Sequence, residues 1–222
     1  MKKKELVKRY VIFFVGLLFN SFGVAFVTKA SLGTSPIAAI PYSLSLIIPK
    51  LSLGNWTIIF SLLLIVLQFI LLRKDANKAE LILQVIISFV FGYFIDFSLV
   101  CLQHFHPEMY GIKIISLLIG CCIIAFGAYL EVIADVVMLP GDAFVRTIAK
   151  VIHKEYGGVR VISDTSMAVI AGILCLVFLH KLSGVREGTI IAALITGNIV
   201  KIFTKVLKPL TRLLIPETTE KQ

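Results

Sequence analysis

The stretch YVIFFVGLLFNSFGVAFVT, residues 10–28, decides the fold class, because it contains no charged side chain. As a helix that rises about 1.5 Å per residue, it would reach across the ~30 Å hydrocarbon core of a bilayer. The whole chain is similarly apolar, since 58% of its 222 residues are hydrophobic and 16% are charged. Soluble domains average about 45–50% apolar and about 25% charged residues. The composition therefore predicts a membrane protein, and it excludes a disordered chain or a disulfide-stapled secreted domain.

Five further stretches are long and apolar enough to cross a bilayer. The six predicted spans cover residues 10–28, 56–72, 81–102, 112–130, 161–179 and 189–206. Two shorter apolar segments, 36–48 and 141–152, begin at a proline or a glycine and are expected to be re-entrant or interfacial helices. The sequence thus predicts an all-α, polytopic helical bundle that forms one membrane domain over residues 1–222.

The 22 Lys and Arg residues divide unequally between the two sides that these spans define. Seventeen fall on the side of the two tails, residues 1–9 and 208–222. The five on the other side are Lys29, Lys50, Lys113, Lys181 and Arg186. Because basic residues accumulate on the cytoplasmic side, both termini are expected to be cytoplasmic. The net charge of +9 is then explained by anionic lipid, and no nucleic-acid partner is expected.

The chain contains an internal repeat with an offset of 104 residues. Residues 16–54 align without gaps on residues 120–158, with nine identical residues among the 39 positions. The identical pairs are Gly16/Gly120, Phe22/Phe126, Gly23/Gly127, Ala30/Ala134, Pro36/Pro140, Ala39/Ala143, Ile48/Ile152, Lys50/Lys154 and Gly54/Gly158. After the insertion of one residue in the second half, the alignment continues and pairs Gln84 with Thr189, Gly92 with Gly197 and Asp96 with Lys201. The alignment predicts one repeat over about residues 10–103 and a second over about residues 112–207.

Each predicted repeat contains a span, a short segment and two further spans. Three crossings is an odd number, so the second repeat must enter the membrane from the opposite face. The two repeats are therefore expected to be inverted relative to each other. Inverted repeats with short, broken helices recur in secondary transporters, in which the binding site lies between the repeats.

The turn after the first span carries the first group of candidate residues. Gly33 permits a tight turn, Thr34 or Ser35 can cap the next helix, and Pro36 suits its first turn. The free N–H groups of such a helix start, together with Ser31, could hold an anionic group of a solute. The alternative is that these residues only cap an interfacial helix.

The corresponding turn of the second repeat is acidic. Asp135 and Asp142 flank Pro140, and Asp142 is placed to cap the helix that follows. Two carboxylates would repel an anion, so the two turns differ in chemistry.

Polar residues inside the predicted spans form the second group of candidates. A charge that faces lipid costs several kcal/mol, so these side chains should face the bundle interior, a partner or a water-filled cavity. Asp96 lies deepest among the charged ones; the alternatives for it are a structural polar contact or a shifted span that makes it interfacial. With the two turns, the candidate solute contacts are Asn20, Ser31, Gly33, Thr34, Ser35, Asp96, Glu131, Asp135, Asp142, Asp164 and Asn198.

The remaining reactive residue types form no familiar site. The four cysteines all fall within predicted spans and are expected to be small core residues. His104 and His106 lie in one predicted loop, but two ligands alone do not make a metal site. The sequence has no nucleotide-binding loop, no catalytic triad order and no His-Glu-x-x-His motif. We therefore expect no enzyme, no cofactor and no metal.

The stretch GVAFVTKASLGTSP, residues 23–36, followed by Gly54-Asn55-Trp56-Thr57, resembles a known family. It is similar to the YczE/YyaS/YitT group of bacterial integral membrane proteins, and most similar to the YczE-like branch. In that group an Ala-x-Leu-Gly-x-x-Pro stretch follows the first span, and a Gly-x-x-(Thr/Ser) pattern opens the next. The resemblance implies a small multi-spanning protein of the bacterial plasma membrane, and it supplies neither a substrate nor catalytic residues.

These observations favour a small secondary transporter or exporter of a low-molecular-weight solute. Its surroundings would be the lipid bilayer, and a homodimer would shelter the polar faces of so few spans. The alternative is a non-transporting membrane factor that assists or regulates another membrane complex.

Overall fold

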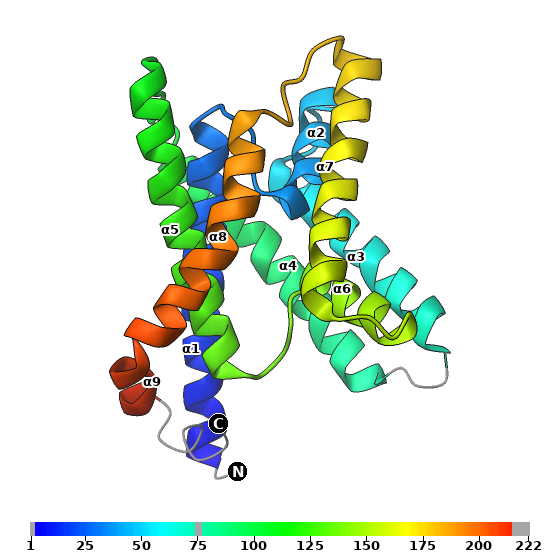
Figure 1. Cartoon of the computed structure of the whole chain (residues 1–222), viewed down its shortest axis with the longest axis vertical. Helices are drawn as coiled ribbons and strands as arrows, with labels where there is room; N and C mark the ends of the chain where they lie inside the picture. The colour runs from blue at the N-terminus through cyan, green and yellow to red at the C-terminus, as the bar shows by residue number, and fades with distance from the viewer. Residues whose placement is uncertain (1–2, 74–76, 215–222) are drawn as a thin grey trace.

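A computed structural model describes residues 3–73 and 77–214, and all the regular structure in these ranges is helical (Figure 1). The helices are α1 (Lys3–Lys29), α2 (Pro36–Ile47), α3 (Leu53–Leu72), α4 (Lys78–Cys101), α5 (Tyr110–Ala134), α6 (Pro140–Val151), α7 (Tyr156–Leu179), α8 (Glu187–Val206) and α9 (Lys208–Leu214). Six of them are long and apolar enough to cross a membrane, which confirms the predicted all-α membrane bundle. Within the predicted basic loops and tails, Lys2, Lys74 and residues 215–222 lie outside the described residues.

The long helices extend beyond the predicted spans, chiefly at their polar ends. α1 begins at Lys3 instead of residue 10, and α7 begins at Tyr156 instead of residue 161. Lys, Arg and Glu are good helix formers, and their long side chains reach polar surroundings from helix ends near a membrane surface. Polar side chains also fix two helix starts: Ser52 accepts a hydrogen bond from the Asn55 N–H in α3, and Asn77 accepts one from the Ala79 N–H in α4.

The two short helices confirm the predicted short segments in position and length. α2 and α6 contain 12 residues each, and both begin at a proline. Such a helix is about 18 Å long, which is too short to cross ~30 Å of hydrocarbon.

α1 and α5 form the centre of the bundle, where glycines allow their backbones to approach closely. A Cβ atom on Gly23 would lie 2.7 Å from the Ile124 nitrogen, and one on Gly127 would lie 2.5 Å from the Asn20 nitrogen. Small residues are a common means of close helix packing in membranes. Around this crossing, Phe13, Leu17 and Tyr129 are fully buried.

Most helix contacts occur in equivalent pairs: where a helix of the first half packs against a given helix, its counterpart in the second half packs against the counterpart of that helix. α2 packs against α7, and its counterpart α6 packs against α3. α1 packs against α4, and α5 packs against α8 in the same way. Two pairs break this pattern. α3 and α4 pack closely, whereas α7 and α8 make almost no contact, and α2 contacts α8, whereas α4 and α6 make almost no contact. Figure 1 shows α8 slanting away from α7 towards the lower end of the molecule, where α1 begins and α8 ends.

We call this end the lower side and the opposite end the upper side, as they are drawn in Figure 1. α8 is the least buried of the six long helices, and α7 is the next least buried. On the lower side the Tyr129 hydroxyl lies 3.1 Å from the Leu207 carbonyl and 2.7 Å from Thr211 Oγ1, which ties the end of α8 and α9 to α5. The outer faces carry large apolar side chains, as expected for contact with lipid.

Candidate functional site

A buried polar pair joins α1 to α5 at the centre of the bundle. The amide nitrogen Nδ2 of Asn20 donates a hydrogen bond to Glu131 Oε1 at 3.0 Å. Asn20 is only 8% exposed, and Glu131 is half-buried. Since α1 belongs to the first half of the chain and α5 to the second, this pair lies between the halves.

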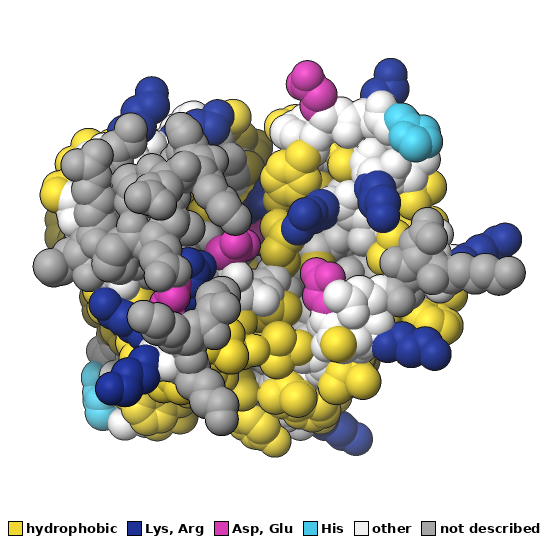
Figure 2. All heavy atoms as spheres, turned by 90° about the horizontal axis from the view of Figure 1, so that it is seen from below, with side chains coloured by type: hydrophobic (Ala, Val, Ile, Leu, Met, Phe, Trp, Pro, Cys, Tyr) yellow, Lys and Arg dark blue, Asp and Glu magenta, His cyan; other side chains and the backbone are white. Residues whose placement is uncertain are grey.

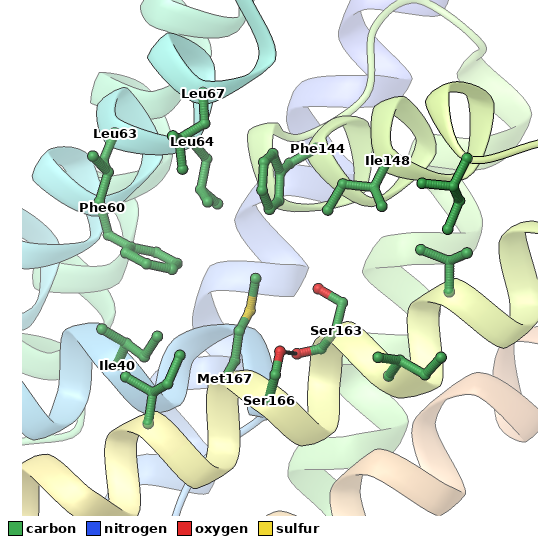
Figure 3. A pocket seen from close by; sticks show the side chains of 14 residues that line it. Ile40, Phe60, Leu63, Leu64, Leu67, Phe144, Ile148, Ser163, Ser166 and Met167 are labelled. Carbon is green, nitrogen blue, oxygen red and sulfur yellow. Dashed lines mark hydrogen bonds between the residues drawn. The ribbon is translucent and has the colours of Figure 1, made fainter. Parts of the chain in front are cut away.

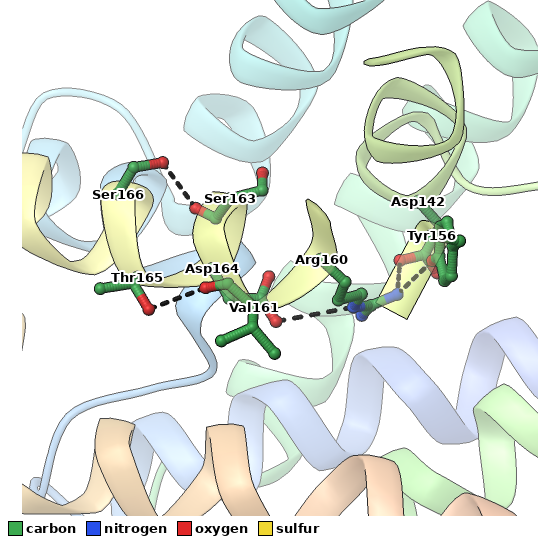
Figure 4. A network of polar contacts seen from close by, with 8 residues as sticks. All are labelled: Asp142, Tyr156, Arg160, Val161, Ser163, Asp164, Thr165 and Ser166. Carbon is green, nitrogen blue, oxygen red and sulfur yellow. Dashed lines mark hydrogen bonds and ion pairs between the residues drawn. The ribbon is translucent and has the colours of Figure 1, made fainter. Parts of the chain in front are cut away.

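A second polar group lies on α6 and α7, and Arg160 is at its centre (Figure 4). Arg160 Nη1 donates to Asp142 Oδ1 in the first turn of α6, and also to the Tyr156 hydroxyl at 2.7 Å. Its Nε lies 3.5 Å from Asp164 Oδ2, one helical turn further along α7. The guanidinium therefore bridges two carboxylates that come from different helices.

One oxygen of this group lacks a partner. Asp164 Oδ1 is buried and has no hydrogen-bond partner among the described residues. The Asp142 carboxylate is close enough to both Asp164 and Glu131 to repel them electrostatically, so we treat the two polar groups together. We define the polar cluster as Asn20, Glu131, Asp142, Arg160 and Asp164. It combines three carboxylates with one guanidinium.

The polar cluster lies beside the weakly packed α7–α8 pair. Figure 4 shows Arg160 and Asp164 on the side of α7 that faces α8 and α1, while Ser163 points to the other side. The lower side of the molecule has acidic side chains near its middle, with Lys and Arg around them (Figure 2). The arrangement thus places charged groups beside two helices of the second half that make almost no contact with each other.

Two glycines define the closed α3–α4 contact, which we call the upper seam. A Cβ atom on Gly92 would lie 2.7 Å from the Gly54 carbonyl oxygen, so only hydrogen atoms fit between the two backbones. The aligned glycines of the second half, Gly158 in α7 and Gly197 in α8, define the lower seam. There, a Cβ atom on either glycine would have no neighbour among the described atoms within 4 Å. The upper seam is closed and the lower seam is open.

Asp96 lies in the upper seam and not in the polar cluster. Its carboxylate accepts a hydrogen bond from Ser52 Oγ at 2.6 Å and another from the Gly54 N–H at 2.9 Å. A carboxylate at this position caps the start of α3 and interacts favourably with the helix dipole. This structural contact accounts for a charge deep in α4. The aligned residue of α8, Lys201, is exposed.

The predicted turn between α1 and α2 is held by the start of α8. The Thr34 N–H donates to Thr189 Oγ1 at 3.2 Å, and the Gly188 N–H donates to the Leu32 carbonyl at 2.9 Å. Gly33 has a positive φ of 103°, and a Cβ atom there would clash with Thr189 Oγ1. Thr34 is therefore buried in a contact between the halves.

The two serines of this turn also lie on the upper side. Ser31 has a φ of 58°, and its carbonyl accepts a hydrogen bond from Arg186 Nη1 at 3.0 Å. Ser35 occupies the N-cap position of α2, but its side chain makes no capping hydrogen bond. The structure brings none of Ser31, Gly33, Thr34 or Ser35 into the polar cluster.

Residues 7–205 match the family described as "Family of unknown function (DUF6198)". The chain belongs to this family. It is 25% identical over 204 residues to "Uncharacterized protein YyaS" of Bacillus subtilis (strain 168), which covers 90% of this chain and 94% of the relative. It is 31% identical over 149 residues to "Uncharacterized membrane protein YczE" of the same strain, covering 67% of this chain and 66% of the relative. The predicted resemblance is confirmed, and no solved structure matches the chain.

Two other predicted residues of this DUF6198 chain lie apart from the polar cluster. Asp135 ends α5 in the left-handed conformation, with φ 48° and ψ 46°, and its side chain is exposed. Asn198 is exposed on α8, and its Nδ2 donates to the Leu194 carbonyl of the same helix at 2.8 Å. Of the predicted contacts, the structure therefore gathers Asn20, Glu131, Asp142 and Asp164.

Sequence reasoning did not select Arg160, which connects the acidic residues of this DUF6198 protein. Arg160 falls in a predicted loop, because the fifth predicted span begins one residue later, at residue 161. The available signal was its spacing of four residues from Asp164, which places both on one face of a helix. Among the described residues, no three His, Cys, Asp or Glu side chains are arranged to hold a metal ion.

Proposed function

We propose that this DUF6198 protein is a secondary transporter of a low-molecular-weight solute, not an enzyme, and that the polar cluster contacts the solute. The observation that carries the proposal is the inequality of two equivalent seams: Gly54 and Gly92 touch, whereas Gly158 and Gly197 do not. A transporter needs one route open and the other closed at any moment. The alternative of a non-transporting factor gives no reason for this difference.

Exchanged helix pairing supports the view that the two halves are inverted repeats. The short helix of each half packs against the third helix of the other, and the first helices of both halves cross at their glycines. In transporters of this design the site lies near the repeat interface. The Asn20–Glu131 pair occupies that position here.

The proposed cycle exchanges the states of the two seams. In the present state the Gly54–Gly92 contact is closed. We infer that the solute reaches the polar cluster from the lower side, between the sparsely packed α7 and α8. The positive-inside rule makes the lower side cytoplasmic, as the basic tails predict, in the plasma membrane of a bacterium. In the second state the Gly158–Gly197 contact forms and the Gly54–Gly92 contact opens. Two arrangements of similar free energy are sufficient for this exchange.

The chemistry of the polar cluster limits the type of solute. Two carboxylates, Asp142 and Asp164, contact a single guanidinium, and Glu131 accepts a hydrogen bond from Asn20. The cluster therefore favours a solute with a cationic or hydrogen-bond-donating group. Arg160 pairs with Asp142 and Asp164, and Asp164 Oδ1 is available as an acceptor. A cationic solute would complete the charge balance of the site.

A thermal-shift screen of the purified protein against metabolites and ions tests the proposal. A solute that binds only the folded protein raises the Tm by mass action. We expect a solute that raises the Tm of the wild type but not of Glu131→Gln, and that crosses proteoliposome membranes containing the wild type. The proposal is wrong if the shifting compounds do not cross these membranes. It is equally wrong if a protein partner co-purifies and no compound shifts the Tm.

A further inference from the structure

Two cavities of opposite polarity lie on different faces of α6. The cavity between α3, α6 and α7 is lined mainly by apolar side chains, among them Phe144 and Ile148 of α6 (Figure 3). The other cavity lies between α3, α4 and α6 and has a volume of about 200 Å³. We call it the polar pocket, after six side chains in its lining: Gln68, Glu80, Gln84, Arg146, Thr147 and Lys150.

Two buried glutamines line the inner part of the polar pocket. Gln68 on α3 and Gln84 on α4 are each only 1% exposed. Gln68 Nε2 donates to Gln84 Oε1 at 3.2 Å and to the Pro140 carbonyl at 3.3 Å. The other amide atoms, Gln68 Oε1 and Gln84 Nε2, have no hydrogen-bond partner among the described residues. Because a buried amide atom without a partner costs free energy, the pair favours an occupant that offers both a donor and an acceptor.

The equivalent position in the other half of the chain is filled by the protein itself. α2 contacts α8 there, whereas their counterparts α6 and α4 make almost no contact. Thr189 of α8 aligns with Gln84, and its hydroxyl oxygen accepts a hydrogen bond from the Thr34 N–H. The polar pocket therefore lies where two helices remain apart and a buried polar group remains unpaired.

Charges of opposite sign line different walls of the polar pocket. Glu80 is on α4, whereas Arg146 and Lys150 are on α6, and all three are exposed. None of the ion pairs among the described residues joins Glu80 to either basic side chain. This separation of charge is complementary to a zwitterion, whose ammonium group would face Glu80 and whose carboxylate would face the two basic residues.

We propose that the polar pocket binds a free amino acid in its zwitterionic form, with a polar side chain that reaches Gln68 and Gln84. The inference goes beyond the proposed transport and does not depend on it, because the polar pocket and the polar cluster share no residue. A volume of about 200 Å³ restricts the occupant to a small molecule, since sites for drug-sized ligands measure about 300–1,000 Å³. Leu72 and Asn77 line the pocket at the lower ends of α3 and α4, so the amino acid would enter from the lower side (Figure 1).

Equilibrium binding of tritiated L-glutamine to the purified full-length protein in detergent tests this proposal. L-Glutamine is the probe because it is a zwitterion whose amide can donate to Gln68 Oε1 and accept from Gln84 Nε2. N-acetyl-L-glutamine lacks the ammonium group, and L-glutamine methyl ester lacks the carboxylate. Each analogue should compete about five-fold or more weakly than unlabelled L-glutamine, because it loses one charged contact. No binding of L-glutamine, or equal competition by all three compounds, would overturn the assignment of a zwitterion.

Substitutions on the two charged walls test the position of the amino acid. Glu80→Gln and Lys150→Glu should each weaken L-glutamine binding by about five-fold or more, and Glu80→Gln should no longer distinguish L-glutamine from its N-acetyl derivative. Glu155→Gln and Lys154→Glu are the matched controls, because both residues are exposed in the α6–α7 turn and neither lines the pocket. Wild-type binding by either folded wall variant contradicts the assignment to the polar pocket.

Glu131→Gln separates this inference from the proposed transport. Glu131 belongs to the polar cluster and does not line the polar pocket, so Glu131→Gln should bind L-glutamine as tightly as the wild type does. Loss of L-glutamine binding in Glu131→Gln would place the amino acid in the polar cluster and overturn the inference, while leaving the transport proposal intact.

Discussion

Replacing Gly92 by alanine should destabilise the protein, whereas the same replacement at the aligned Gly197 should not. In the closed upper seam, the new Cβ at position 92 would lie 2.5 Å from Ile58 Cγ1 and 2.7 Å from the Gly54 carbonyl oxygen. The Ile58 side chain can rotate away, but the Gly54 oxygen is backbone, so α3 and α4 must separate by about 1 Å to reach an ordinary contact distance. At position 197 the new Cβ would meet no described atom within 4 Å.

The size of the effect follows from two terms. Overpacking of this kind costs about 1–3 kcal/mol. Alanine gains about 1 kcal/mol over glycine within a helix, and this gain applies to both positions. Gly92→Ala should therefore lose up to about 2 kcal/mol, and Gly197→Ala should gain up to about 1 kcal/mol. The two variants should therefore differ in free energy of unfolding by about 1–3 kcal/mol, because the gain from alanine's higher helix propensity is the same at both positions and cancels.

Reversible unfolding in mixed detergent micelles measures this difference. The two variants carry the same chemical change on aligned positions of helices that are both long and apolar, so each serves as the control of the other. Equal stabilities for Gly92→Ala and Gly197→Ala would refute the assignment of one closed and one open seam.

Substitutions at three further positions have defined outcomes in the same assay. Asp96→Ala removes the acceptor of the Ser52 and Gly54 hydrogen bonds and should cost about 1–3 kcal/mol. Gly33→Ala should lower the free energy of unfolding by about 2 kcal/mol, because φ at Gly33 is 103° and Thr189 occupies the position of the new Cβ. A loss below about 0.5 kcal/mol would be inconsistent with this turn conformation. Glu131→Gln retains an acceptor for Asn20, so its free energy of unfolding should stay within about 1 kcal/mol of the wild-type value. Glu131→Ala removes the acceptor and should lose about 1–3 kcal/mol. Similar free energies of unfolding for Glu131→Gln and Glu131→Ala would exclude the Asn20 contact.

The membrane fold is predictable from sequence because it depends on composition over long windows. An uninterrupted apolar run such as residues 10–28 has few alternatives to a spanning helix. The ends are less predictable, since Lys and Arg are compatible both with the last turns of a helix and with a loop. This is why α1 begins seven residues before the predicted span, at Lys3.

The candidate site is only partly predictable, because its members come from four helices. Asn20, Glu131, Asp142 and Asp164 stand out as polar residues in or beside apolar segments. Which of them meet depends on helix packing, and no local pattern encodes that. Asp96 is equally conspicuous, yet it meets the start of α3, 42 residues away along the chain, and becomes a cap.

The difference between the two seams is the feature that sequence reasoning could not reach. Gly54 and Gly92 align with Gly158 and Gly197, so the residues that permit close contact are present in both halves. Identical residues allow either seam to close. In the proposed cycle the conformational state determines which seam is closed, and in this structure it is the upper seam.

Paired distances across both seams in liposomes test the central claim most directly. Spin labels at Asn55 and Phe97 report on the upper seam, and labels at Val161 and Ile202 report on the lower seam, with the exposed native cysteines replaced by serine. All four positions are exposed. The account predicts two populations: one with a short upper-seam distance and a long lower-seam distance, and one with a long upper-seam distance and a short lower-seam distance. A bound solute should shift the ratio of the two populations. One fixed distance at each seam under every condition, or two seams that open and close together, would contradict it.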